Sequence, residues 1–188
     1  MKMKICLLLF CLYLSVAVSG GEQSDIIEEA IIAGDYKAVI NVLDSGLDIN
    51  KKNQNGRVPI MYAVGIHNSV SDVENVKRSY KKYSKENLVI LKMLLDSDAD
   101  PNIQDNMGKT AIFYSVYHNR LGSTWLLLMN GADLDIKDLN GNTATYYAEY
   151  HGYEELVELI QLYKRSAAKD QKGSMGSPIS RSLSIGHS

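Results

Sequence analysis

The chain has 188 residues, 45% of them hydrophobic, which is enough for one sizeable core. Its formal net charge is only −2 at pH 7 and its isoelectric point is about 6.1, so the composition carries no basic field of the kind that nucleic-acid-binding proteins use. We therefore expect no nucleic-acid partner.

The N-terminal residues 1–20 are predicted to be a secretory signal peptide. Two lysines precede an apolar run over 5–18, and small residues follow it. The run has 14 residues, short of the roughly 20 that a membrane-spanning helix needs. We expect cleavage after Ser19 or Gly20, export to the periplasm or outside the cell, and no stable membrane anchor afterwards.

Both cysteines, Cys6 and Cys11, lie within this segment. The mature protein would then contain no thiol, which excludes disulfides, zinc–cysteine sites and cysteine nucleophiles. An exported domain of this kind must be held together by its apolar core.

The rest of the chain repeats itself. The stretches 108–119 and 141–152 share Gly, Thr, Ala, Tyr, Tyr and His at matching places, and Gly108 and Gly141 are 141 − 108 = 33 residues apart. A fixed period of this size is typical of a solenoid, in which each unit buries its apolar face only against its neighbours.

The first two units are predicted over 25–54 and 55–105. The first contains a helix pair over 26–43 and serves as an N-terminal cap. The second is longer, because Gly56 and Gly108 are 52 residues apart and 52 − 33 leaves 19 extra residues.

The extra residues of the second unit fall around 69–86. Apolar residues recur there every three or four positions, which predicts an N-terminal extension of the second helix. Cations cover its other faces, at Lys77, Arg78, Lys81, Lys82 and Lys85. They form either a solvated helix face or a dedicated site for an anion or a partner.

The third and fourth units are predicted over 106–138 and 139–165. The third has helices at 110–118 and 121–129, and the fourth ends in a charged helix over 154–165 that serves as the C-terminal cap. The remaining tail, 166–188, is rich in Ser and Gly and is predicted to be disordered.

Two sequence boxes identify the repeat type. The pattern T-P-L-H-x-A is approximated at 58–63, 110–115 and 143–148, and the pattern L-L-x-x-G-A-D-x-N at 42–50, 94–102 and 127–135. In these boxes the chain resembles the ankyrin repeat family over about 25–165. The resemblance implies an all-α solenoid of about four helix-turn-helix repeats with short β-turn tips, a monomeric protein, and no enzymatic role or cofactor.

One departure from the family pattern bears on the tips. Its His slot holds Met61, Phe113 and Tyr146. The hydrogen bonds that the family's His gives to the turn are then missing, and we expect apolar packing to replace them.

The resemblance places partner contacts on the turn tips and the first helix of each unit. The candidates are Arg57, Tyr62, Met107, Lys109, Tyr114, Tyr117, His118, Asn140, Asn142, Tyr147, Tyr150 and His151. Aromatic residues with a polar tip are common at interfaces. For Tyr62, Tyr114 and Tyr147, which share one slot, core packing and partner contact both remain open.

Metal and catalytic sites are not expected. The stretch 96–107 begins like a calcium loop, but Pro101 replaces the required Gly and Met107 the bidentate Glu. His67, His118 and His151 would be spread along the repeats, too far apart for one metal ion. No phosphate loop or catalytic motif is visible.

The function expected from the sequence is protein binding through the concave groove of an exported repeat domain. The alternatives are a bacterial envelope immunity or inhibitor protein, or a secreted effector, directed at a specific enzyme. An enzymatic or envelope-anchored protein is the rival class.

Overall fold

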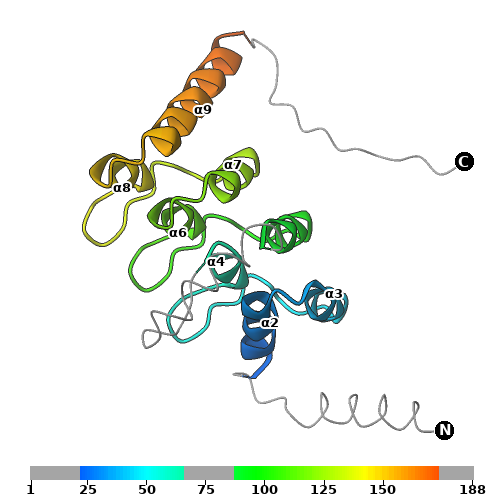
Figure 1. Ribbon diagram of the computed structural model, residues 1–188. Coiled ribbons are helices and arrows are strands. Elements are labelled where there is room, and N and C mark those ends of the chain that lie inside the picture. Colours follow the sequence, from blue (N-terminus) through cyan, green and yellow to red (C-terminus); the bar gives the residue numbers. More distant parts are fainter. Residues whose placement is uncertain (1–21, 66–86, 174–188) are drawn as a thin grey trace, which may run out of the picture.

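The computed structural model describes residues 22–65 and 87–173 (Figure 1). Regular structure in these ranges is helical, apart from one isolated antiparallel bridge between Lys137 and Thr143. The helices are α2 (Glu22–Ala33), α3 (Tyr36–Asp44), α4 (Pro59–Ala63), an unlabelled helix over 87–96, α6 (Ala111–Tyr117), α7 (Leu121–Met129), α8 (Ala144–Tyr150) and α9 (Glu154–Gly173).

The helices stack in two rows. Helices α2, α4, α6 and α8 form the first row, in which each helix packs on the next, and α3, 87–96, α7 and α9 form the second (Figure 1). The loops that precede α4, α6 and α8 project from the same edge of the stack, beside the first row (Figure 1). We call them the tips, over 51–57, 103–109 and 136–142. This arrangement confirms the predicted all-α solenoid.

The core lies between the two rows. Its largest fully buried side chains come from both rows and every repeat: Ile27, Ile31, Ile60, Met61, Tyr62, Ile90, Leu91, Leu94, Ile112, Leu127, Leu128 and Leu156. Because each repeat buries its apolar face against its neighbours, no single helix pair is a separate core.

Glycine at the tips is required by close packing between repeats. Gly56 and Gly108 have φ of +71° and +75°, a region that side chains with a Cβ rarely adopt. A Cβ at Gly56 would lie 2.4 Å from the Oδ1 of Asn106 on the next tip, and one at Gly108 would lie 3.0 Å from the backbone nitrogen of Leu139. The 33-residue recurrence of Gly therefore reflects the stacking of one tip on the next.

A ladder of asparagine side chains ties each repeat to the following one. Asn50 donates to the carbonyl of Asp98 at 3.0 Å and accepts from the amide of Asp100 at 2.8 Å. Asn102 repeats both bonds one unit later, to the carbonyl of Gly131 at 2.9 Å and from the amide of Asp133 at 2.8 Å. We call this set the asparagine ladder.

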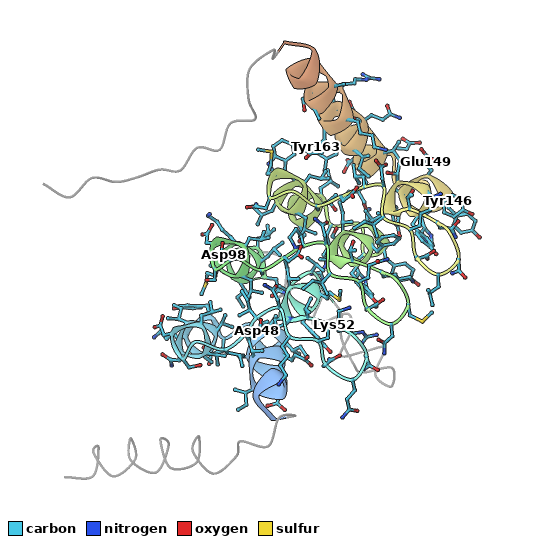
Figure 2. The ribbon with its side chains drawn as sticks, turned by 180° about the vertical axis from the view of Figure 1, so that it is seen from behind. Asp48, Lys52, Asp98, Tyr146, Glu149 and Tyr163 are labelled. Atoms are coloured by element: carbon cyan, nitrogen blue, oxygen red, sulfur yellow. The ribbon has the colours of Figure 1, made fainter. Side chains whose placement is uncertain are left out.

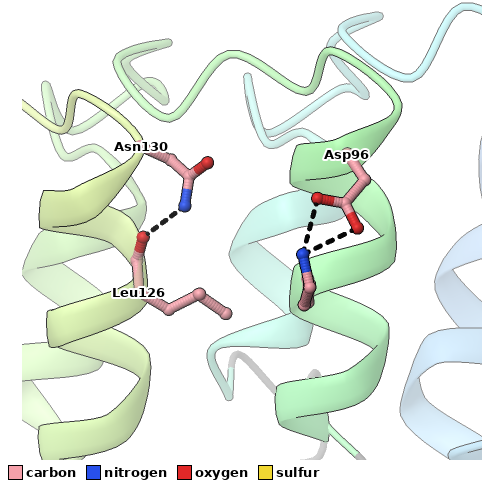
Figure 3. A network of polar contacts seen from close by, with 4 residues as sticks. Asp96, Leu126 and Asn130 are labelled. Carbon is pink, nitrogen blue, oxygen red and sulfur yellow. Dashed lines mark hydrogen bonds and ion pairs between the residues drawn. The ribbon is translucent and has the colours of Figure 1, made fainter. Parts of the chain in front are cut away.

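The aspartates that resemble a calcium loop have structural partners. Asp96 forms an exposed ion pair with Lys92 at 2.8 Å, shown in Figure 3 beside the bond from Asn130 to the carbonyl of Leu126 on α7. Asp100 accepts from the amide of Asn102 at 2.8 Å. Within the ranges 22–65 and 87–173, no three His, Cys, Asp or Glu side chains gather as a metal site would require.

The last helix is longer than the sequence indicated. Helix α9 continues to Gly173, so the predicted boundary at 165, with a disordered tail from 166, is wrong for 166–173. These residues read SAAKDQKG, and Ala, Lys and Gln are good helix formers that can extend a helix already started by packing. Composition alone had grouped them with the Ser- and Gly-rich stretch that follows.

Several predictions fall outside the described residues. They are the signal peptide, the helical extension at 69–86 with its five cations, and His67. Among the helices that are described, none is both long enough and apolar enough to cross a membrane.

Candidate partner-binding surface

Each tip is organised by one polar side chain at its centre. Asn53 accepts the amides of Asn55 and Arg57 through Oδ1, at 2.9 and 3.0 Å. Asp105 and Asp138 do the same in the next two tips, and in every case the donors lie two and four residues later, at 2.8 to 3.0 Å. The backbone of the tip is thus folded around this side chain.

A tyrosine on the following helix holds the same side chain from the other side. The amide of Asn53 donates to the hydroxyl of Tyr62 at 2.8 Å, and the hydroxyl of Tyr147 donates to Oδ2 of Asp138 at 2.7 Å. Tyr114 donates to Oδ2 of Asp105 in the same way. We call these three pairs, each nine residues apart, the tip latches.

The latches correct one expectation about the tips. Met61, Phe113 and Tyr146 occupy the family's His slot, and apolar packing alone was expected to replace the lost hydrogen bonds. That is wrong, because the tyrosine one position later ties the tip to the helix. The spacing of Asn or Asp and Tyr was present in all three units and could have revealed it.

The electrostatics of the latches keep their donors and acceptors fixed. Burial, and then the hydrogen bond to the Asp105 carboxylate, raise the pKa of Tyr114 far above its usual value. Burial by itself would raise the pKa of Asp138, but hydrogen bonds from Tyr147, Asn142 and Asn140 outweigh it and hold that pKa below its usual range. At neutral pH the pairs are therefore a phenol donor and a carboxylate acceptor.

The latches decide the role of one set of candidates. Tyr62 is fully buried, so its predicted contact with a partner is wrong in this structure. Tyr114 and Tyr147 are half-buried and pack against the core while serving the latches. Arg57 is also half-buried, and its positive charge acts on the Tyr114 hydroxyl, so part of its role is internal.

The ends of α6 and α8 carry a continuous group of aromatic rings. The rings of Tyr117 and His151, from adjacent repeats, meet edge to face with centroids 5.7 Å apart. His151 also stacks on Tyr153 at 5.4 Å, and Tyr146 stacks on Tyr150 at 6.0 Å. We call the whole group the aromatic cluster: Tyr117, His118, Tyr146, Tyr147, Tyr150, His151 and Tyr153.

Much of the aromatic cluster faces solvent. Tyr150 is 71% exposed, Tyr117 55% and Tyr146 44%. The structure therefore brings together the two predicted pairs, Tyr117 with His118 and Tyr150 with His151. Figure 2 shows Tyr146 on the outer side of α8.

Two members of the aromatic cluster were not among the candidates. Tyr146 was assigned to packing because it fills the His slot. Tyr153 was missed because the slot 33 residues earlier holds Arg120, so no repeat pattern marked it. Its hydroxyl reaches the carbonyl of Tyr117 at 3.5 Å, which links the last turn to α6.

A small pocket lies between the tip side of α6 and α8. Its volume is about 150 Å³, and its walls are Lys109, Phe113, Tyr114, Tyr117 and Tyr147. The rings of Phe113 and Tyr147 meet edge to face at 6.1 Å, and the Lys109 ammonium lies 5.5 Å from the centre of the Tyr147 ring. We call it the α6–α8 pocket; four of its five wall residues were sequence candidates, and Phe113 was not.

The tips lie side by side and continue this surface. Asn106 donates to the carbonyl of Asn55 at 3.1 Å, and Leu139 donates to that of Met107 at 3.0 Å. Met107 is 54% exposed and Leu139 73%, while Asn142 is half-buried. The tips, the α6–α8 pocket and the aromatic cluster thus form one face of the molecule, on the first row of helices.

The comparisons with known proteins agree with this architecture. Residues 82–172 match the family model for ankyrin repeats, in three copies. Helices α2 and α4 precede the matched segment, yet they continue the same row, since α2 packs on α4 and α4 on α6. Comparison with curated proteins gives no significant match.

Proposed function

We propose that this ankyrin-repeat solenoid binds a partner protein through the face built by its tips and its first row of helices, with the aromatic cluster at the centre of the contact. Ankyrin repeats are protein–protein interaction modules, typically without enzymatic activity. The single observation that carries the proposal is the aromatic cluster, which spans two repeats.

Exposed rings in mutual contact are favourable for binding. A single exposed apolar side chain on a protein surface is ordinary, whereas a contiguous patch marks an interaction site. Tyr117, Tyr146 and Tyr150 each contact other rings of the cluster, so their rotamers are already restricted before binding. Less side-chain entropy is then lost on association.

The rings also have the chemistry that interfaces favour. Tyr offers a large apolar face and a hydroxyl, and it is among the residue types enriched at interface hot spots. The cluster contains five tyrosines and two histidines, and it contains no carboxylate. A partner can therefore bury much apolar area here without removing a negative charge from water.

We also propose that the domain works outside the cytoplasm, in the periplasm or as a secreted protein, and that it is a monomer. The order of charged, apolar and small residues in 1–21 supports export.

The test of the binding face uses two tyrosines and a matched control. Once a partner has been isolated with the full chain, Tyr117→Ala and Tyr150→Ala should each weaken binding at least about tenfold, since buried interface aromatics commonly cost about 2 kcal/mol or more on truncation. Tyr36→Ala is the control, because Tyr36 is 49% exposed on α3 in the second row. Calorimetry gives the affinities and circular dichroism verifies that each variant is folded.

The contrary result is equally clear. If both tyrosine variants bind normally while deletion of 69–86 abolishes binding, the contact is at the inserted segment and not on this face.

A further inference from the structure

The α6–α8 pocket has the size of a single side chain. A cavity of about 150 Å³ is large enough for one benzene ring, and the α6–α8 pocket has that volume. Its walls are mostly rings, contributed by Phe113, Tyr114, Tyr117 and Tyr147. The pocket therefore suits one aromatic or branched aliphatic side chain and is too small for a helix or a strand.

The polar group at the pocket is a cation. Lys109 forms part of the wall, and it lies at the end of the middle tip. A lysine or arginine that entered the pocket would bring a like charge to the Lys109 ammonium, which is unfavourable in a partly dry site. An apolar side chain with a carboxylate next to it in the sequence would meet an opposite charge.

The charge of the neighbouring tips extends this preference. The tips carry five cations, Lys51, Lys52, Arg57, Lys109 and Lys137. Their only carboxylates, Asp105 and Asp138, are buried and occupied by the tip latches. Lys52, which Figure 2 shows on the first tip, and Lys137 are exposed. The edge beside the pocket is therefore positive although the whole chain is slightly negative.

Negative charge gathers elsewhere on the described part of the chain. Glu149, Glu154 and Glu158 line a separate hollow at the junction of α8 and α9. The two signs are thus separated along the face, which gives an incoming partner a preferred orientation.

We propose that the α6–α8 pocket receives one ring-sized apolar side chain of the partner protein, and that acidic residues flanking this side chain face the basic tips. This deepens the proposed function and rests on it, since it concerns the same face. It commits the partner to a definite chemistry, an acidic surface segment with one large apolar anchor.

The test uses synthetic peptides in place of the unidentified partner. The first has a central phenylalanine with three aspartates on each side; the second has alanine at the centre; the third keeps phenylalanine but has lysines in place of the aspartates. Each is titrated to about 5 mM into the isotopically labelled full chain at low salt, and the amide signals of Lys109, Tyr117 and Tyr147 are followed by NMR.

The first peptide should saturate these signals, and the other two should bind at least about tenfold more weakly, because burial of one large side chain or removal of a like-charge contact is worth about that factor. Lys109→Glu should reverse the preference between aspartate and lysine flanks. Lys164→Glu, the same charge change at an exposed position on α9, should leave the preference unchanged.

Three results would overturn the proposal: no saturation by the first peptide, equal binding of the aspartate and lysine peptides, or the same effect from Lys164→Glu as from Lys109→Glu. These outcomes are separable from failure of the proposed function. If the peptides fail while Tyr117→Ala and Tyr150→Ala still weaken the natural complex, only the chemistry of the pocket is wrong.

Discussion

At the scale of single residues, the side chain of Asp138 organises the last tip through three hydrogen bonds. Its Oδ1 accepts the amides of Asn140 and Asn142 at 2.9 and 3.0 Å, and its Oδ2 accepts the hydroxyl of Tyr147 at 2.7 Å. Asn53 does the same work with an amide, since Tyr62 can accept where Tyr147 donates. The latch thus requires a short side chain with an oxygen toward the backbone, and the charge is a separate matter.

The charge of Asp138 should appear as a pH dependence of stability. Its pKa is lowered in the folded state, from the ordinary value of 3.8. The carboxylate therefore stabilises the fold above that value, and this contribution is lost as the pH falls through the lower, folded-state pKa. We expect the free energy of unfolding of the parent chain to fall below about pH 4, and Asp138→Asn to remove part of that fall.

Asp138→Ala provides the contrast at neutral pH. It leaves two tip amides and a phenol without their acceptor, where each buried unsatisfied group costs about 1 to 3 kcal/mol. Urea unfolding followed by circular dichroism at several pH values measures both variants. An acid dependence in Asp138→Asn as steep as in the parent would contradict the assignment.

The residue scale also shows where sequence reasoning ended. The face that carries Tyr117, His118, Tyr150 and His151 could be predicted, because the 33-residue period fixes equivalent positions on adjacent first helices. The burial of Tyr62 could not, since a slot in a repeat does not state how far the neighbouring tip covers it. The ring contacts of Tyr153 depend on the turn before α9, which has no equivalent elsewhere in the chain.

At the scale of helices and loops, the asparagine ladder determines how one repeat is held on the next. Asn102 offers both its donor and its acceptor to backbone groups of the following repeat, at 2.9 and 2.8 Å. The equivalent position 33 residues later is Asp135, and no hydrogen bond from its side chain occurs among the described residues. The two positions are a matched pair within one chain.

We expect Asn102→Ala to destabilise the protein by about 1 to 3 kcal/mol, because two backbone groups lose a net favourable partner. Asp135→Ala should change stability by less than about 0.5 kcal/mol, as most surface substitutions do. Chemical unfolding of the two variants side by side measures the difference. Equal effects would show that the asparagine ladder does not contribute to stacking.

The helices themselves were largely predictable. The ranges expected for the third unit, 110–118 and 121–129, agree with α6 and α7 to within a residue or two, because a tip glycine before them and a left-handed residue between them bound each helix. Asn119 and Gly152 hold that left-handed turn in successive repeats, with φ of +51° and +66°. The far end of α9 has no such signal, and its extension to Gly173 follows only from propensity.

At the scale of the whole molecule, the position of the domain outside the cytoplasm is the prediction that depends on the N-terminal segment alone. We expect protein recovered from the exported fraction to begin at Gly20 or Gly21, which intact-mass spectrometry detects. Leu8→Arg should block export, because it places a charge in the apolar run on which signal recognition depends. Lys164→Glu is the control. Recovery of a chain that still begins at Met1, or of the protein only in the cytoplasm, would contradict this prediction.

Gene duplication would act differently at the two ends of this stack. An additional repeat copied from the second unit carries its own Asn102 equivalent and can be inserted before α6, where the preceding and following repeats already make and accept the same bonds. After α9 there is no loop with the backbone groups that an asparagine would bind, and Asp135 marks the point at which that requirement ended. The lineage of this protein can therefore lengthen its N-terminal part while the aromatic cluster, encoded by the last two repeats, is inherited unchanged.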